Sequence, residues 1–167
     1  MVASSRQCLA QGVERAGPAP LAVLRIPKIR LEVPVLPGTD DRILDRGVGH
    51  IEDTAPPGTD GNSGIAGHRD GFFRGLKDIV PGDAIELDTL DGKEAYRVER
   101  TWVVDPEDVS VLDPTPTRVL TLVTCYPFYF VGSAPAGSSS VPCVSPTNRS
   151  PGGRQPERLG NDRASRF

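Results

Sequence analysis

The stretch RVLTLVTCYP, residues 118–127, is a continuous apolar run that ends in Cys-Tyr-Pro. Short apolar runs bounded by turn residues are typical of strands buried within a sheet. Pro127 ends regular pairing because proline has no amide hydrogen to donate. The stretch therefore predicts a buried strand that places the thiol of Cys125 at the rim of a sheet.

Similar patterns on both sides predict further short strands. Residues 21–36, LAVLRIPKIRLEVPVL, are aliphatic at short alternating spacing, and Pro27 and Pro34 divide them into short or edge strands. The other expected elements are a strand over 62–68, a hairpin over 84–104 that turns at Asp91-Gly92, and helical turns within 40–47, 71–79 and 105–117. We predict a mostly β domain over residues 21–135, a small barrel or sandwich with a few short helices.

The two ends of the chain have a different composition. Residues 1–20 lack both an apolar run long enough to span a bilayer and the apolar core of a signal peptide, and we expect a flexible leader. Residues 136–167 are dense in Ser, Pro, Gly and Arg and have almost no apolar periodicity. Such a segment buries too little apolar surface to offset its ordering entropy, so we expect a disordered tail.

Composition and charge exclude several classes of function. The formal net charge of −3 is too close to balance to indicate nucleic acid as a partner. The three cysteines, Cys8, Cys125 and Cys143, form no CxxC pair and have no histidine at zinc-ligand spacing. We therefore expect no metal site and no cofactor.

Cys125 and His68 are the candidate chemical pair. Each ends an apolar strand, and the chain has only two histidines, so a cysteine–histidine site has few ways to form. Taken singly, a cysteine here is more often a small buried hydrophobe, and a histidine at a strand end is more often structural. The residues alone leave both interpretations open.

Three segments together resemble the sortase family. TLVTCYP, residues 121–127, is similar to the TLxTC signature, and GNSGIAGHRDGFFRGL, residues 61–76, is similar to the segment that carries the family histidine. LRIPKIRLEVPVLPGTD, residues 24–40, resembles the opening strands. The three occur in family order over residues 21–135 and are most like class D. The resemblance implies a sortase-like closed β-barrel.

The resemblance also implies an activity. Cys125 would be the nucleophile that attacks an LPxTG-like sorting signal and forms a thioester, and His68 the general acid and base. The partners would be surface proteins with such a signal and an amine acceptor of cell-wall or pilin type, outside the cytoplasmic membrane. Two alternatives remain: a thiol protease that uses water as acceptor, and a catalytically impaired sortase-fold remnant that at most binds peptide.

The sequence departs from the family pattern after residue 135. The family arginine that stabilises the oxyanion belongs on the strand after the cysteine, but no arginine occurs between Arg118 and Arg149. Arg69 adjoins the histidine, and we assign it no role. If Ser138–Ser140 use TCN codons, the frame starting at the third base of codon 136 permits arginine, three apolar residues and a second arginine. We hypothesise that a frameshift near codon 136 removed the final strand; AGY serine codons would exclude it.

Two further features are interpreted as structural rather than catalytic or metal-binding. The acidic loop with Asp105, Glu107, Asp108 and Asp113 matches no EF-hand spacing, so a solvated loop is favoured over a calcium site. His50 resembles a position where the family often has a histidine near the site, and we expect a supporting or structural role for it.

Overall fold

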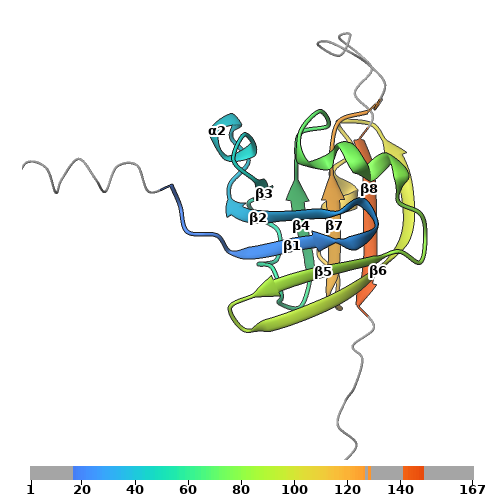
Figure 1. Cartoon of the computed structure of the whole chain (residues 1–167). Helices are drawn as coiled ribbons and strands as arrows, with labels where there is room; N and C mark the ends of the chain where they lie inside the picture. Colours follow the sequence, from blue (N-terminus) through green and yellow to red (C-terminus); the bar gives the residue numbers. More distant parts are fainter. Residues whose placement is uncertain (1–16, 127, 129–140, 149–167) are drawn as a thin grey trace, which may run out of the picture.

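A computed structural model describes residues 17–126, 128 and 141–148. Within these residues eight strands form a closed barrel in the order β1-β2-β3-β4-β7-β8-β6-β5, and β5 pairs with β1 to close it (Figure 1). The strands are β1 (Ala22–Ile26), β2 (Leu31–Pro37), β3 (Val48–His50), β4 (Asn62–Ala66), β5 (Ala84–Thr89), β6 (Gly92–Val104), β7 (Val119–Val123) and β8 (Val141–Asn148). The mostly β, closed-barrel prediction is confirmed.

The two early prolines have different effects. Pro27 begins a short 3₁₀ turn, η1 (Pro27–Ile29), and Arg30 then takes a left-handed conformation with φ +52°, so the chain reverses into β2. Pro34 lies within β2 opposite Val23 of β1, whereas pairing of β2 with β3 starts only at Val35. Its missing amide therefore costs no hydrogen bond on the β3 side.

The three predicted helical turns are present, whereas η1 was not predicted. The predicted turns are α2 (Asp41–Leu44) and the 3₁₀ turns η2 (Phe72–Asp78) and η3 (Val109–Leu112). Asp40 caps α2, because its carboxylate accepts hydrogen bonds from the amides of Arg42 at 3.0 Å and Ile43 at 3.2 Å. The predicted hairpin is also present, with β5 ending at Thr89 and β6 starting at Gly92, whose φ is +145°.

The core fills the barrel interior with alternate side chains from the strands. In β1 the buried positions are every second residue, as expected for a strand with one face inward. The fully buried aliphatic residues include Leu24, Val35, Ile65, Ile85, Leu87, Leu120 and Leu122. Burial raises the pKa of the Tyr96 hydroxyl to about 12, with a smaller contribution from the charge of Glu94.

The structure differs from the sequence prediction after residue 140. Val141–Asn148, which we expected to be disordered, form β8 between β6 and β7, so the barrel has a final strand. Backbone pairing accounts for this, because β6 and β7 each present an edge whose amides and carbonyls need partners, and the extended segment pairs with both edges. The remaining residues of the predicted leader (1–16) and tail lie outside the described residues.

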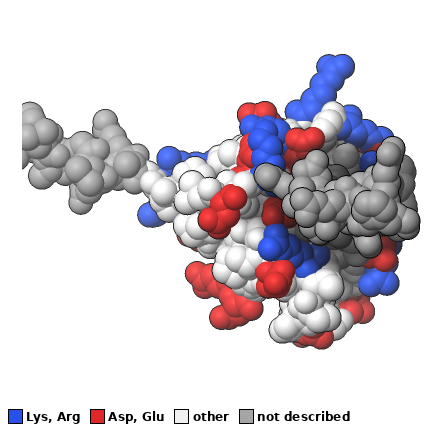
Figure 2. All heavy atoms as spheres, turned by 90° about the horizontal axis from the view of Figure 1, so that it is seen from below, with Lys and Arg blue, Asp and Glu red and all other residues white. Residues whose placement is uncertain are grey.

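The surface carries charges of both signs. Acidic and basic side chains are interspersed on the face shown in Figure 2. Among the described residues, no helix is long and apolar enough to cross a bilayer.

Candidate active site

The register of two parallel strands brings His68 and Cys125 together. β4 and β7 pair from Asn62↔Val119 to Ala66↔Val123, so each β7 residue is numbered 57 higher than its partner. The same offset aligns His68 with Cys125, two residues beyond the last pair. The amide of Gly67 donates to the carbonyl of Val123 at 3.1 Å, so the chains stay joined past the strand ends. Both side chains therefore emerge at the same edge of the sheet.

Cys125 lies just past the end of β7, where the chain becomes exposed. Leu120, Leu122 and Thr124 are buried, at most 3% exposed, whereas Cys125 is exposed and carries a free thiol. Thr121, between Leu120 and Leu122, is also buried at 1% exposure, so β7 is covered on both faces and exposure begins only past its end. The prediction that the thiol sits at the rim of the sheet is confirmed, and the interpretation of Cys125 as a small buried hydrophobe is wrong.

His68 is held by the turn that follows it. Its carbonyl accepts hydrogen bonds from the amides of Gly71 at 3.1 Å and Phe73 at 3.3 Å. Phe73 is fully buried and packs on Gly67, where the Cβ of any larger residue would lie 2.6 Å from the ring. Glycine at 67 thus lets η2 approach the strand end, and this contact fixes the backbone from which the His68 ring projects.

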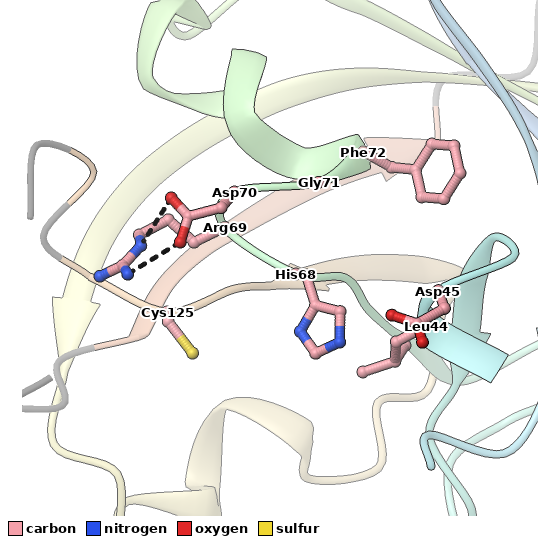
Figure 3. Close-up of a pocket in the computed structure, with 8 residues that line it drawn as sticks. All are labelled: Leu44, Asp45, His68, Arg69, Asp70, Gly71, Phe72 and Cys125. Atoms are coloured by element: carbon pink, nitrogen blue, oxygen red, sulfur yellow. Dashed lines mark hydrogen bonds and ion pairs between the residues drawn. The ribbon is translucent and has the colours of Figure 1, made fainter. Parts of the chain in front are cut away.

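The two residues line one pocket of about 720 Å³. Its other described lining residues come from the end of α2 and from the turn between β4 and η2, and they are Leu44, Asp45, Arg69, Asp70, Gly71 and Phe72. Figure 3 shows the imidazole of His68 between Cys125 on one side and Leu44 with Asp45 on the other. A thiol and an imidazole in one open pocket suit nucleophilic acyl chemistry. The catalytic roles of Cys125 and His68 remain a prediction.

Arg69 is the residue that the sequence analysis set aside. It is only 7% exposed and lines the pocket. Its Nε donates to Asp70 Oδ1 at 3.3 Å and its Nη2 to Asp70 Oδ2 at 3.0 Å. These hydrogen bonds are the main reason that the pKa of Asp70 lies below its ordinary value and the pKa of Arg69 above it. The Arg-Asp dipeptide directly after the histidine was the signal available in the sequence.

His50 lies outside this pocket. Its Nε2 is 3.0 Å from the Ala55 carbonyl and 3.1 Å from Thr54 Oγ1. The Thr54 hydroxyl donates to the Ile51 carbonyl at 2.6 Å, so its single hydrogen is used and Nε2 of His50 must carry the donated proton. His50 therefore ties the loop after β3 in place, which fits the expected structural role.

The acidic loop is also held by hydrogen bonds. Asp108 accepts from the amide of Ser110 at 3.1 Å and from its hydroxyl at 2.5 Å, and these bonds lower the pKa of the Asp108 carboxyl. Asn62 donates to the carbonyls of Val111 at 2.9 Å and Asp113 at 3.2 Å, which fastens η3 over β4. Within the described residues, no three His, Cys, Asp or Glu side chains are placed to hold a metal ion.

Comparison with known proteins identifies the family. The sortase domain model matches residues 24–134, about two thirds of the chain. The chain belongs to the sortase family. It is 40% identical to Sortase D of Bacillus subtilis over 114 residues, which cover 68% of this chain and 58% of that protein. It is 38% identical to the sortase SrtE1 of Streptomyces coelicolor over 125 residues, 64% of this chain and 36% of that protein.

Solved sortase structures share the fold. A Clostridium perfringens Sortase D5 transpeptidase superposes with a TM-score of 0.70 at 26% identity, covering 88% of this chain and 90% of that one. Sortase A from Corynebacterium diphtheriae gives a TM-score of 0.71 at 28% identity, covering 91% and 72%. The predicted likeness to class D is confirmed. Sortases are cysteine transpeptidases of the cell surface. The chain spans less than two thirds of the length of the curated relatives it matches.

Proposed function

We propose that this chain is a transpeptidase that cleaves an LPxTG-like sorting signal through a thioester on Cys125 and transfers the acyl group to an amine. The observation that carries the proposal is the shared register and shared pocket of His68 and Cys125. Family membership supports the reaction class. The proposed partners are surface proteins with such a signal and a cell-wall or pilin-type amine, which places the reaction outside the cytoplasmic membrane.

The chemistry follows from the two side chains. The Cys125 thiolate forms a bond to the scissile carbonyl carbon, and the carbonyl π electrons move to its oxygen. When this oxyanion collapses, the C–N bond breaks, and the leaving amine takes a proton from His68. An incoming amine then gives up a proton to His68 as it attacks the thioester, and Cys125 leaves as thiolate. If water replaces the amine, the same steps give a thiol protease.

The pocket walls suit a peptide substrate. Leu44 and Phe72 offer apolar surface beside the reacting pair, and Phe72 is 36% exposed. Cys125 is exposed, so its thiol is accessible from outside. An extended chain laid across this edge would place a carbonyl near both Cys125 and His68.

Capture of the thioester tests the proposal. The full chain is incubated with an LPxTG-type peptide and hydroxylamine, and threonine hydroxamate is measured by mass spectrometry. We expect product from the wild type and from the matched control Cys8→Ala, none from Cys125→Ala, and a rate about 10²–10⁴ lower in His68→Gln. Adding a glycine-type or lysine-type amine separates transfer from hydrolysis. Equal product from Cys125→Ala and wild type would refute the nucleophile.

One observation favours a second candidate, an impaired sortase that only binds peptide. Residues 119–148 contain neither arginine nor lysine, so β8 brings no cationic side chain to the barrel. The sortase match ends at residue 134, just before the proposed frameshift near codon 136. Loss of one oxyanion donor typically lowers the rate about 10²–10³-fold. Peptide binding by calorimetry without hydroxamate would support this candidate, and AGY codons at Ser138–Ser140 would exclude the frameshift.

A further inference from the structure

Asp45 is an exposed carboxylate in the wall of the pocket that contains His68 and Cys125. Figure 3 shows it with Leu44 beyond the imidazole of His68, on the side away from Cys125. Among the described residues, the Asp45 carboxylate takes part in no hydrogen bond or ion pair, and only its backbone amide is bonded, within α2. The carboxylate is therefore available to a ligand of opposite charge.

The other charged groups of the pocket do not neutralise this carboxylate. Asp70 and Arg69 pair with each other, and Nη2 of Arg69 lies 3.0 Å from Oδ2 of Asp70. The described lining thus holds two carboxylates and one guanidinium, which is already paired. The nearest cations in sequence, Arg42 and Arg46, do not line the pocket, and the guanidinium of Arg46 lies against Gly17.

The segment that carries the nucleophile adds no charge of either sign. Residues 119–148, from β7 to the end of β8, contain no Asp, Glu, Lys or Arg. The charges of the described lining therefore come from the end of α2 and from the turn after β4. Their balance is one excess negative charge, which is that of Asp45.

The proposed reaction brings amines to this side of the pocket. The leaving and the incoming amine each exchange a proton with His68, so each must lie beside the imidazole. The chain attached to that nitrogen can then extend beyond His68, where Leu44 and Asp45 form the wall. A carboxylate in the wall attracts a cationic group on this chain and repels an anionic one.

We propose that Asp45 selects the amine acceptor, favouring one that carries a positive charge close to the reacting nitrogen. This role rests on the function proposed above, because it concerns the acceptor side of that reaction. The preference of the pocket for cations, however, is measurable without any peptide. If Asp45 only oriented the imidazole of His68, its removal would slow transfer to every acceptor by the same factor.

Matched acceptors test the selection. The LPxTG-type peptide is incubated with the full chain and with Gly-Lys-amide, Gly-Gln-amide or Gly-Glu-amide, which share the reacting nitrogen and differ in one neighbouring charge. We expect kcat/KM for the acceptor to fall in that order in the wild type. In Asp45→Asn the ratio of Gly-Lys-amide to Gly-Glu-amide should fall roughly two- to fivefold, the size expected of an exposed ion pair.

Charged thiol reagents test the pocket without peptide. The Cys125 thiolate attacks the sulfenyl sulfur of a methanethiosulfonate, an S–S bond forms and methanesulfinate leaves, so no oxidant is needed. The cationic trimethylammonioethyl and the anionic sulfonatoethyl reagents are compared by mass spectrometry that resolves the three cysteines. The ratio of their rates at Cys125 in the folded chain is divided by the ratio in urea. We expect this quotient to favour the cation in the wild type and to fall roughly two- to fivefold in Asp45→Asn.

The control removes an equal charge far from the pocket. Asp91 is exposed in the turn between β5 and β6 and does not line the pocket, so Asp91→Asn should leave both readouts near wild type. Asp45→Glu keeps the charge and should retain most of the preference. Unchanged ratios in folded Asp45→Asn would overturn the proposal. If Asp45→Asn does not fold, a salt series on the wild type decides, and a cation preference that is absent or does not weaken with salt overturns it.

The two measurements separate this role from the proposed function. A wild type that forms no thioester with peptide, but loses its preference for the cationic reagent in Asp45→Asn, contradicts the function and supports the charge selection by Asp45. A wild type that transfers the acyl group with the same acceptor ratios as Asp45→Asn supports the function and refutes the role of Asp45.

Discussion

Gly67→Ala adds one methyl group where β4 gives way to His68. Its Cβ would lie 2.6 Å from Cδ2 and 2.8 Å from Cγ of Phe73. Carbon atoms in contact are ordinarily about 3.5–4.0 Å apart, so the methyl group overlaps the ring by roughly 1 Å. Phe73 is 0% exposed, and the ring has no solvent to move into. Either η2 or the strand end must shift.

Two opposing terms set the size of the effect. Overpacking a close-packed site costs about 1–3 kcal/mol. Gly67 is not among the glycines with positive φ, so alanine also gains about 0.4–1 kcal/mol by restricting the unfolded chain. We therefore expect the free energy of unfolding to fall by about 1–2 kcal/mol. Gly67 directly precedes His68, so a shift of the strand end also displaces the imidazole of His68. We therefore expect slower alkylation of Cys125 by iodoacetamide.

Urea unfolding followed by circular dichroism measures the change in stability. Phe73→Leu shortens the side chain that the methyl group meets, so it is the matched partner for a double-mutant cycle. The double variant should be more stable than the sum of the two single effects predicts, by about 1 kcal/mol. The reasoning is refuted if Gly67→Ala is as stable as wild type, or if the two substitutions are additive.

Three further predictions concern the barrel. Leu122→Ala should lower the free energy of unfolding by about 2–5 kcal/mol in urea titration, because Leu122 is 0% exposed and its removal leaves a cavity. Asn62→Ala should cost about 1–3 kcal/mol and speed limited proteolysis of the β6–β7 loop, because the buried Thr121 hydroxyl loses its 2.7 Å acceptor and the loop its anchor. The pKa of Asp83 is lowered by hydrogen bonds from Lys28 and the Val80 amide, so its stabilisation is present above the unfolded carboxyl pKa of about 3.9 and is lost as the pH falls through the lower folded value. Unfolding at several pH values should show a shallower acid loss in Asp83→Asn.

The sequence predicted the local elements of the site but not their alignment. Apolar runs that end in Cys125 and His68 placed each residue at a strand end. Nothing in a single strand's pattern specifies which other strand pairs with it, or in which register, because parallel pairing is a long-range choice. The resemblance to sortases implied that Cys125 and His68 act together, and the constant offset of 57 residues between β4 and β7 is what brings them to one edge.

Two features could not be derived from sequence for different reasons. The burial of Arg69 depends on how the turn after β4 packs against the barrel, and arginine is an exposed residue by default. The sequence of β8 has little apolar alternation, although its backbone pairs with both β6 and β7. The pattern of apolar residues in a sequence indicates neither the burial of a charged side chain nor the pairing of a weakly apolar strand between two others.

Barrel closure involves the backbone of the strand after the cysteine, whereas the chemistry of the site depends on its side chains. Closure involves backbone pairing of Val141–Asn148 with β6 and β7, and the segment VPCVSPTN pairs with both although it contains two prolines. Stabilising an oxyanion needs a cationic or donating side chain at a fixed point, which that sequence lacks as an arginine or lysine. A sequence change in this strand can therefore preserve the fold and remove a charge. Stability measurements alone would not detect such a loss, whereas capture of the thioester from an LPxTG-type peptide measures the reaction itself.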